Sequence, residues 1–174
     1  MNLPKKNILI TGYPGIGKTT LIKQLINEFG PYHPVGFYTE EIREKDVRHG
    51  FEIISIDGRR KTLAHTSLGG EFRVGRYGID VYGFENFISE IVLFNSFHKL
   101  IVIDEIGRME CLSPKFRALI RRTLNSKKAL IATIALRGRG IIEEIKQRED
   151  VGLLQLTLQN RESLFSEISG LLRG

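Results

Sequence analysis

A glycine-rich segment near the beginning of the chain contains the residue types that binding of a polyphosphate requires. Residues 12–19 read Gly-Tyr-Pro-Gly-Ile-Gly-Lys-Thr and match the pattern G-x-x-x-x-G-K-[S/T] at each fixed position. Glycines allow backbone N–H groups to converge on phosphate oxygens, and a helix starting near Lys18 directs the positive end of its dipole at them. Lys18 would reach the β- and γ-phosphates, and the Thr19 hydroxyl would bind magnesium. The segment predicts a nucleoside triphosphate site with Mg2+ as cofactor.

A buried strand and an amphipathic helix must position this loop. Residues 7–11 form a short apolar run that is typical of a strand buried on both faces. After Lys18 the apolar residues recur at helical spacing, and Gly30-Pro31 ends the helix. A strand, a glycine loop and a helix in series are the context that the motif requires. They favour a phosphate site over a merely flexible turn.

Two acidic residues that follow another apolar run form the second candidate site. Residues 100–103 read Leu-Ile-Val-Ile, and Asp104 and Glu105 come next. A parallel neighbouring strand would bring Asp104 to the phosphate end of the sheet, where it would hold the magnesium shell through water. Glu105 would orient or deprotonate the water that attacks the γ-phosphate, so the predicted catalytic residues are Glu105 and Lys18. Alone, the run fits a strand ending in a solvated acidic turn equally well, but the upstream loop favours the metal site.

Three further side chains are weaker candidates for the same site. Thr133 lies in an apolar run and could sense the γ-phosphate, although a threonine inside a strand is more often structural. Arg137 and Arg139, in Leu-Arg-Gly-Arg-Gly, could reach a charge that develops in the transition state, or could belong to a solvated turn. We assign no transition metal, because ligand spacing is absent among His33, His49, His65 and His98.

Alternating elements in the last third of the chain predict a three-layer α/β fold. Apolar runs at residues 100–103, 129–135 and 152–158 alternate with helical patterns at residues 114–124, 141–148 and 161–172. This alternation implies crossover connections and a mostly parallel sheet covered on both faces. Ser113 and Asn160 are the predicted N-caps of the helices that follow them.

The central third has a different character. Residues 35–42 and 51–56 are rich in aromatic and β-branched side chains, and a charged turn is predicted between them at residues 43–50. A glycine-rich piece at residues 68–83 precedes a helical pattern at residues 84–94. We expect this third to be an antiparallel extension of the sheet within a single domain spanning residues 1–174.

Composition limits the class of protein. The chain has 174 residues, of which 41% are hydrophobic and 26% charged, as in ordinary globular domains. Neither an apolar run of about 18 residues nor a secretion signal is visible, and the single cysteine, Cys111, makes no demand for an oxidising compartment. We therefore expect a cytoplasmic protein without a membrane segment, and a monomer by default. The net charge of +6 is spread along the chain, so a nucleic-acid partner is not favoured.

Four segments together resemble the cancer-related nucleoside-triphosphatase family over nearly the whole chain. They are residues 12–20, Gly-Phe-Tyr-Thr-Glu-Glu at 36–41, Val-Gly-Arg-Tyr at 74–77 and Val-Ile-Asp-Glu-Ile-Gly-Arg-Met-Glu at 102–110. The resemblance implies a P-loop fold akin to the RecA and AAA+ group. It also implies magnesium-dependent hydrolysis of ATP, GTP and other nucleoside triphosphates to the diphosphate, with little base preference.

The resemblance also implies which residues touch the nucleotide. These are Gly12, Tyr13, Pro14, Gly15, Ile16, Gly17, Lys18, Thr19, Thr20, Val102, Ile103, Asp104, Glu105, Ile106, Gly107, Arg108 and Met109. Three positions depart from the family pattern, in which proline, lysine and leucine are common where this chain has Tyr13, Arg108 and Cys111. None of these departures removes a phosphate-binding or metal-binding group.

Two other functions remain open at this point. A nucleotide or small-molecule kinase would have the same loop, with Arg137 and Arg139 in a lid, and would need an acceptor rather than water. A nucleotide-gated module that binds nucleic acid or protein would use hydrolysis as a timer, and its binding to RNA or DNA would depend steeply on salt.

Overall fold

The apolar run before the glycine loop forms β1 (Asn7–Thr11), and all five of its residues are buried. The computed structural model describes residues 5–173 of the chain. The other strands are β2 (Val35–Glu44), β3 (Val47–Ser55), β4 (Arg60–His65), β5 (Arg73–Val74), β6 (Tyr77–Ile79), β7 (Leu100–Ile106), β8 (Ala129–Ile134) and β9 (Val151–Gln155). The α-helices are α1 (Lys18–Glu28), α2 (Val81–Ser89), α3 (Pro114–Asn125), α4 (Ile141–Lys146) and α5 (Arg161–Arg173). Two short 3-10 helices span Gly30–Tyr32 and Glu110–Leu112.

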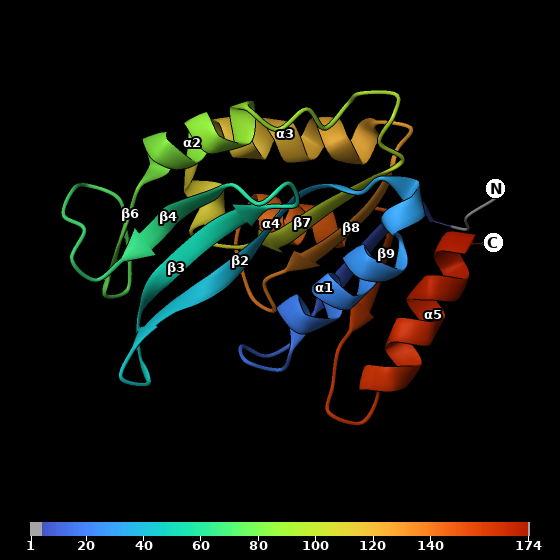
Figure 1. The fold of residues 1–174 in the computed structure, drawn as a ribbon, viewed down its shortest axis with the longest axis horizontal. Helices are drawn as coiled ribbons and strands as arrows, with labels where there is room; N and C mark the ends of the chain where they lie inside the picture. Colours follow the sequence, from blue (N-terminus) through green and yellow to red (C-terminus); the bar gives the residue numbers. More distant parts are fainter. Residues whose placement is uncertain (1–4, 174) are drawn as a thin grey trace.

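One mixed sheet organises these elements (Figure 1). Between residues 5 and 173 it has nine strands in the order β5-β6-β4-β3-β2-β7-β8-β1-β9. Strands β2, β7, β8, β1 and β9 are parallel to their neighbours in that order. The pairs β2–β3, β3–β4, β4–β6 and β5–β6 are antiparallel. The predicted α/β fold with an antiparallel extension from the central third is confirmed.

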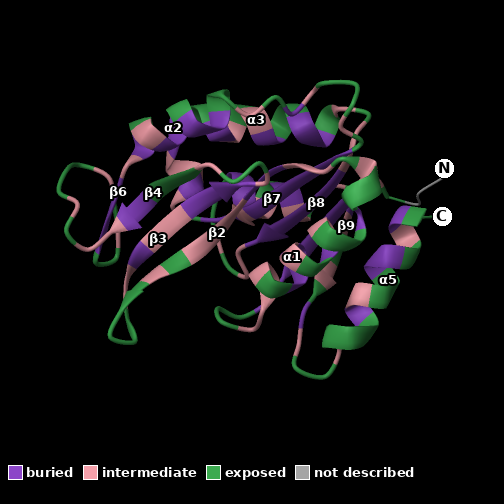
Figure 2. Ribbon diagram, viewed as in Figure 1, coloured by how far each residue is buried: buried purple, intermediate pink, exposed green. Residues whose placement is uncertain are grey.

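Helices cover both faces of the parallel part of the sheet. Side chains of α2, α3 and α4 form one apolar cluster with strand residues such as Leu9 and Phe37. Side chains of α1 and α5 form the other cluster, with Ile8 and Ile10 of the same strand β1. Because successive residues of a strand point to opposite faces, burial on both faces requires an unbroken apolar run. Figure 2 shows the buried central strands between helices whose outer faces are exposed.

The order of the strands corrects one expectation. The strand that contains Asp104, β7, continues to Ile106 and does not lie beside β1, because β8 lies between them. The carboxyl ends of parallel strands still meet at the same edge of a sheet. Asp104 and the glycine loop therefore meet across the end of β8.

Several boundaries in the central third differ from the prediction. The charged segment at residues 43–50 is not a long turn: β2 continues to Glu44, β3 begins at Val47, and only Lys45 and Asp46 connect them. Strand β4 was not predicted, and α2 begins at Val81, three residues earlier than expected, after Asp80 accepts a hydrogen bond from the Gly83 N–H. Pairing with a neighbouring strand can stabilise a strand whose sequence does not alternate between apolar and polar residues, so the sequence pattern missed these boundaries.

The two predicted helix caps have different outcomes. The Ser113 hydroxyl accepts a hydrogen bond from the Phe116 N–H at 2.9 Å, which confirms this cap. The Asn160 main-chain carbonyl accepts from the Leu164 N–H, but its side-chain oxygen accepts from the Thr157 N–H in the preceding loop. The Asn160 side chain therefore closes the loop rather than capping α5. Every helix in the described range is too short or too polar to cross a bilayer, and the longest, α5, has 13 residues.

A close backbone approach at Gly36 joins the antiparallel extension to the parallel core. A Cβ atom at this position, where φ is +137°, would lie 1.8 Å from the Val102 carbonyl oxygen of β7. Gly36→Ala is therefore expected to lower the free energy of unfolding by about 3 kcal/mol, because backbone must move to admit the methyl group. Urea unfolding followed by circular dichroism measures the change.

Gly170→Ala is the matched control. Gly170 lies in α5 with open space around it, so alanine there is expected to stabilise the protein by about 0.5–1 kcal/mol. Equal effects of the two substitutions would contradict the role of Gly36.

Candidate active site

The glycine loop ends in a helix N-terminus that no side chain caps. Gly17, with φ +106°, is the N-cap residue of α1, and no side chain in the described chain bonds to its free N–H groups. The left-handed backbone at Gly17 favours glycine. Uncapped N–H groups at a helix N-terminus, with no acidic residue in the first turn, form a binding site for an anion.

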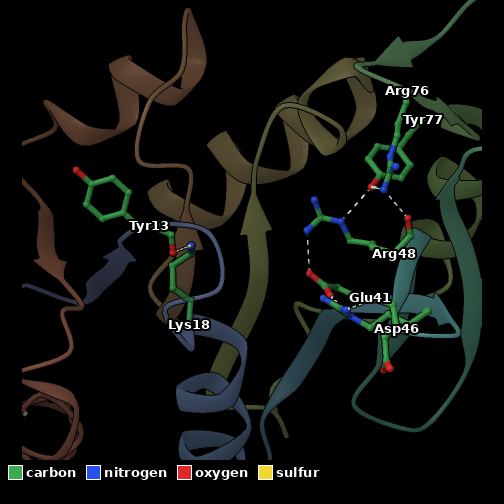
Figure 3. A network of polar contacts seen from close by, with 8 residues as sticks. Tyr13, Lys18, Glu41, Asp46, Arg48, Arg76 and Tyr77 are labelled. Atoms are coloured by element: carbon green, nitrogen blue, oxygen red, sulfur yellow. Dashed lines mark hydrogen bonds and ion pairs between the residues drawn. The ribbon is translucent and has the colours of Figure 1, made fainter.

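Lys18 lies folded over this loop. Its Nζ donates hydrogen bonds to the carbonyl oxygens of Gly12 at 3.0 Å and Tyr13 at 3.3 Å. The contact with Tyr13 is drawn in Figure 3. The Lys18 side chain is only 10% exposed, so its charge faces the inside of the loop. An ammonium group held there can balance the negative charge of a bound phosphate.

Asp104 joins three strands and α1 at the carboxyl edge of the sheet. The Thr19 hydroxyl donates to its Oδ2 at 2.7 Å, and the Thr39 N–H donates to the same oxygen at 3.4 Å. The Thr133 hydroxyl donates to Oδ1. Burial of the side chain raises the pKa of Asp104 above its ordinary value, and these three hydrogen bonds offset part of the increase.

The oxygen atoms around Asp104 suit a hard divalent cation. All three donors to the buried carboxylate are neutral groups, so its negative charge has no hydrogen-bonded cation beside it. Hydroxyl and carboxylate oxygens are ligands that Mg2+ prefers, and this ion usually takes only one or two ligands from the protein and the rest from phosphate and water. Residues 5–173 contain no cluster of three His, Cys, Asp or Glu side chains that could hold a metal by themselves.

Glu105 lies beside Lys18 and keeps some contact with solvent. Its Oε2 lies 3.8 Å from the Lys18 Nζ, and its side chain is 30% exposed. Burial raises the pKa of Glu105, the charge of Lys18 lowers it, and the charge of Asp104 raises it further. A carboxylate with a raised pKa next to the phosphate loop can accept a proton from water.

Glu110 is a second buried carboxyl group next to Glu105. An added Cβ at Gly107 would lie 2.8 Å from the Glu110 Oε2 and 2.9 Å from the Glu105 Oε1, so the two carboxyl groups flank this glycine. Burial, followed by the charge of Glu105, raises the pKa of Glu110 to about 8. The same surroundings raise the pKa of the Cys111 thiol to about 12, so this half-buried cysteine packs against the core in its neutral form.

The other predicted site residues fall into two groups. Thr133 contacts Asp104 as described, so the structure brings it into the site. Arg137 and Arg139 follow β8 at the same edge but are exposed, and their side chains make no hydrogen bond or ion pair with the described residues. Their catalytic role stays a prediction.

The nucleotide contacts predicted around β7 stay a prediction, and burial limits which atoms could make them. The side chains of Val102, Ile103 and Ile106 are at most 1% exposed and lie in the two cores. Only their backbone can face a nucleotide. Gly107 is also buried, whereas Arg108 is exposed and Met109 is half-buried against the core.

The Val-Gly-Arg-Tyr motif has a structural role. Arg48 of β3 donates to the Tyr77 hydroxyl at 3.0 Å and to Glu41 of β2 at 2.9 Å, and Arg76 donates to the same hydroxyl at 3.1 Å (Figure 3). This network ties the β2–β3 hairpin to β6. It belongs to the antiparallel extension and contains none of the predicted phosphate ligands.

Sequence reasoning missed two contributors to the site. The Thr39 N–H reaches Asp104 because β2 runs parallel to β7, and the only signal was the family-specific segment at residues 36–41. Glu110 lies next to Glu105 because the chain turns at residues 107–109, between β7 and a short 3-10 helix. The Thr39 contact cannot be read from local spacing, and the Glu110 contact depends on the shape of this turn.

A strand, a glycine loop, an uncapped helix and a buried aspartate bonded to Thr19 define the class: a P-loop nucleotide-binding protein. Comparison with known proteins agrees. A family model described as NTPase matches residues 7–169. The nucleoside-triphosphatase THEP1 of Thermotoga maritima is 45% identical over 168 residues, covering 95% of each chain. The human cancer-related nucleoside-triphosphatase is 36% identical over 182 residues, covering 94% of each chain.

Solved structures show the same fold. The crystal structure of THEP1 from Aquifex aeolicus superposes with a TM-score of 0.88 at 35% identity, covering 97% of this chain and 99% of that chain. The solution structure of the human cancer-related nucleoside triphosphatase gives a TM-score of 0.79 at 32% identity, covering 95% and 96%. The chain belongs to this family of P-loop nucleoside triphosphatases.

The raised pKa of Glu110 has a consequence for stability. In the unfolded chain this carboxyl titrates near 4.5, and in the folded protein near 8. Folding therefore favours the protonated form, so its stabilising contribution is complete below pH 4.5 and is lost as the pH rises toward about 8. The loss in the free energy of unfolding is on the order of a few kcal/mol, and each kcal/mol lowers the Tm by about 2–4 °C.

Thermal unfolding of the ligand-free protein between pH 5 and pH 8.5 measures this effect. The Tm of the wild type is expected to fall more steeply with pH than that of Glu110→Gln, whose side chain does not titrate. Glu149→Gln, at an exposed glutamate, should follow the wild type. Parallel curves for wild type and Glu110→Gln would show that Glu110 is charged in the folded protein at neutral pH.

Proposed function

We propose that this protein hydrolyses nucleoside 5'-triphosphates, with magnesium, to the diphosphate and phosphate, and that ATP, GTP and other bases are accepted. The observation that carries the proposal is the hydrogen bond of 2.7 Å between the Thr19 hydroxyl and the buried Asp104. It supports the proposal because the hydroxyl of Thr19 and the carboxylate of Asp104 lie together, and the ion pair of Lys18 with Glu105 lies at the same end of β7. The names of the relatives support the same reaction.

Each residue has a defined task in this reaction. The free N–H groups of the loop and of α1 bind phosphate oxygens, and Lys18 exchanges its carbonyl partners for the β- and γ-phosphates. Glu105 orients a water toward the γ-phosphate and accepts its proton, and burial, which raises the pKa of Glu105, makes it a stronger base than an exposed carboxylate. Thr133 and Thr39 fix the Asp104 carboxylate in its orientation. Mg2+, bound through Thr19 and Asp104, would neutralise charge that develops on the phosphates.

Water is favoured as the acceptor over a second substrate. What supports water is the carboxylate of Glu105, which lies 3.8 Å from the Lys18 Nζ beside the phosphate loop and could act as a base on a water molecule. Release of phosphate that requires an added acceptor would instead support a kinase. We expect the reaction to take place in the cytoplasm, because the lone cysteine is a free thiol.

Lys18→Ala and Glu105→Gln test the assignment. Lys18→Ala is expected to lower phosphate release by about 100-fold or more and to weaken binding of the triphosphate, because the positive charge that contacts the phosphates is lost. Glu105→Gln should retain binding and lower kcat by about 10²–10⁴-fold, because only the base is lost. Phosphate release from ATP, GTP and CTP with Mg2+ measures both effects.

Two controls match these substitutions in chemistry. Lys127→Ala and Glu149→Gln change exposed side chains at the opposite end of the strands and should leave the rate unchanged. Undiminished release by both Lys18→Ala and Glu105→Gln would show that the reaction takes place elsewhere.

The metal requirement gives a separate test. Removal of divalent cations with EDTA is expected to abolish phosphate release, and added Mg2+ to restore it. Thr19→Ala should raise the Mg2+ concentration for half-maximal rate by about tenfold or more, because a ligand is lost. Thr62→Ala, at an exposed threonine of β4, is the control. Full activity in EDTA would exclude the metal site.

A further inference from the structure

The loop between β9 and α5, residues 156–160, packs directly against the phosphate loop. The Leu156 N–H donates to the Thr11 carbonyl oxygen at 2.8 Å, and the Leu156 carbonyl oxygen would lie 2.8 Å from a Cβ at Gly12. Arg161, the first residue of α5, donates to the Ile16 carbonyl oxygen at 2.6 Å. Figure 1 shows both loops at the same edge of the sheet.

The geometry of the metal site sets the direction of a bound triphosphate. Its γ-phosphate end must face β7, because Asp104 and Glu105 lie there and Lys18 reaches Glu105. In the sheet, β7 lies on one side of β1 and β9 lies on the other. The nucleoside end therefore leaves the phosphate loop toward β9 and residues 156–161.

An apolar side chain without a partner lies at this end. Leu158 is 68% exposed, more than any other large hydrophobic side chain in the described chain. Two polar side chains of this loop are already engaged: the Asn160 amide bonds to Thr157 and Gln155, and Arg161 bonds to the phosphate loop. The exposed Leu158 side chain offers a ligand an apolar contact.

We propose that residues 156–161 form the nucleoside subsite, in which Leu158 packs against the face of the base and Arg161 holds the subsite against the phosphate loop. This inference builds on the proposed function and names the part of the site that distinguishes a nucleotide from bare polyphosphate. Every base presents an apolar face, and a contact with that face reads no hydrogen-bond pattern. The subsite therefore accepts all bases with similar affinity.

Binding of diphosphates tests the subsite without any need for turnover. Calorimetry with Mg-ADP, Mg-GDP and Mg-pyrophosphate gives the contribution of the nucleoside as a ratio of Kd values. Leu158→Ala is expected to raise the Kd of both nucleotides by about fivefold, the scale of losing part of a buried leucine contact, and to leave the Kd of pyrophosphate unchanged. Leu153→Ala, at the exposed leucine of β9, should change neither.

A tryptophan reporter gives an independent measurement. The chain has no tryptophan, so Leu158→Trp places a single indole in the proposed subsite and Leu153→Trp places one outside it. Mg-ADP should change the fluorescence of Leu158→Trp, whereas pyrophosphate should not, and Leu153→Trp should respond to neither.

Three results would overturn the subsite. These are wild-type protein that binds ADP no more tightly than pyrophosphate, a Leu158→Ala variant with an unchanged ADP-to-pyrophosphate ratio, and a Leu158→Trp signal that both ligands change equally. Failure of the proposed function would look different, because phosphate release would be absent while these binding ratios are still measured.

Discussion

The buried carboxylate of Asp104 is the constraint on which the rest of the site depends. A charged group taken out of water is costly unless hydrogen bonds or counter-charges surround it. Here Thr19, Thr39 and Thr133 supply those bonds from α1, β2 and β8. The same bonds fix the phosphate loop relative to the end of β7. The site is thus held by the atoms that would bind the metal.

Three acidic groups lie close together at the end of β7, and their surroundings separate their roles. Asp104 is fully enclosed by neutral donors, Glu105 is paired with Lys18 and partly exposed, and Glu110 is buried beside Glu105. Like charges at short range cannot all be ionised without cost. A neutral Glu110 leaves Glu105 as the carboxylate that faces the phosphate loop.

The two parts of the sheet serve the site in different ways. The parallel strands bring Asp104, Thr133 and the loops after β1 and β9 to one edge. In the antiparallel extension, β2 continues beyond the residues that pair with β7. The network of Arg48, Tyr77 and Arg76 holds this extension in place. Its contact with the site is the Thr39 N–H. In the proposed reaction, the phosphate loop lies between the metal site at β7 and the nucleoside subsite at β9.

The sequence by itself determined the phosphate loop, the strand and helix around it, and the acidic pair at residues 104–105, because glycine conformations, helix dipoles and apolar periodicity act over short stretches of chain. Strand β4, the placement of β8 between β1 and β7, and the contacts of Thr39 and the β9–α5 loop were decided only by the tertiary structure. These features depend on pairing and packing between segments far apart in the chain. No local pattern records such partners, because the free energy that selects them arises only when the sheet assembles.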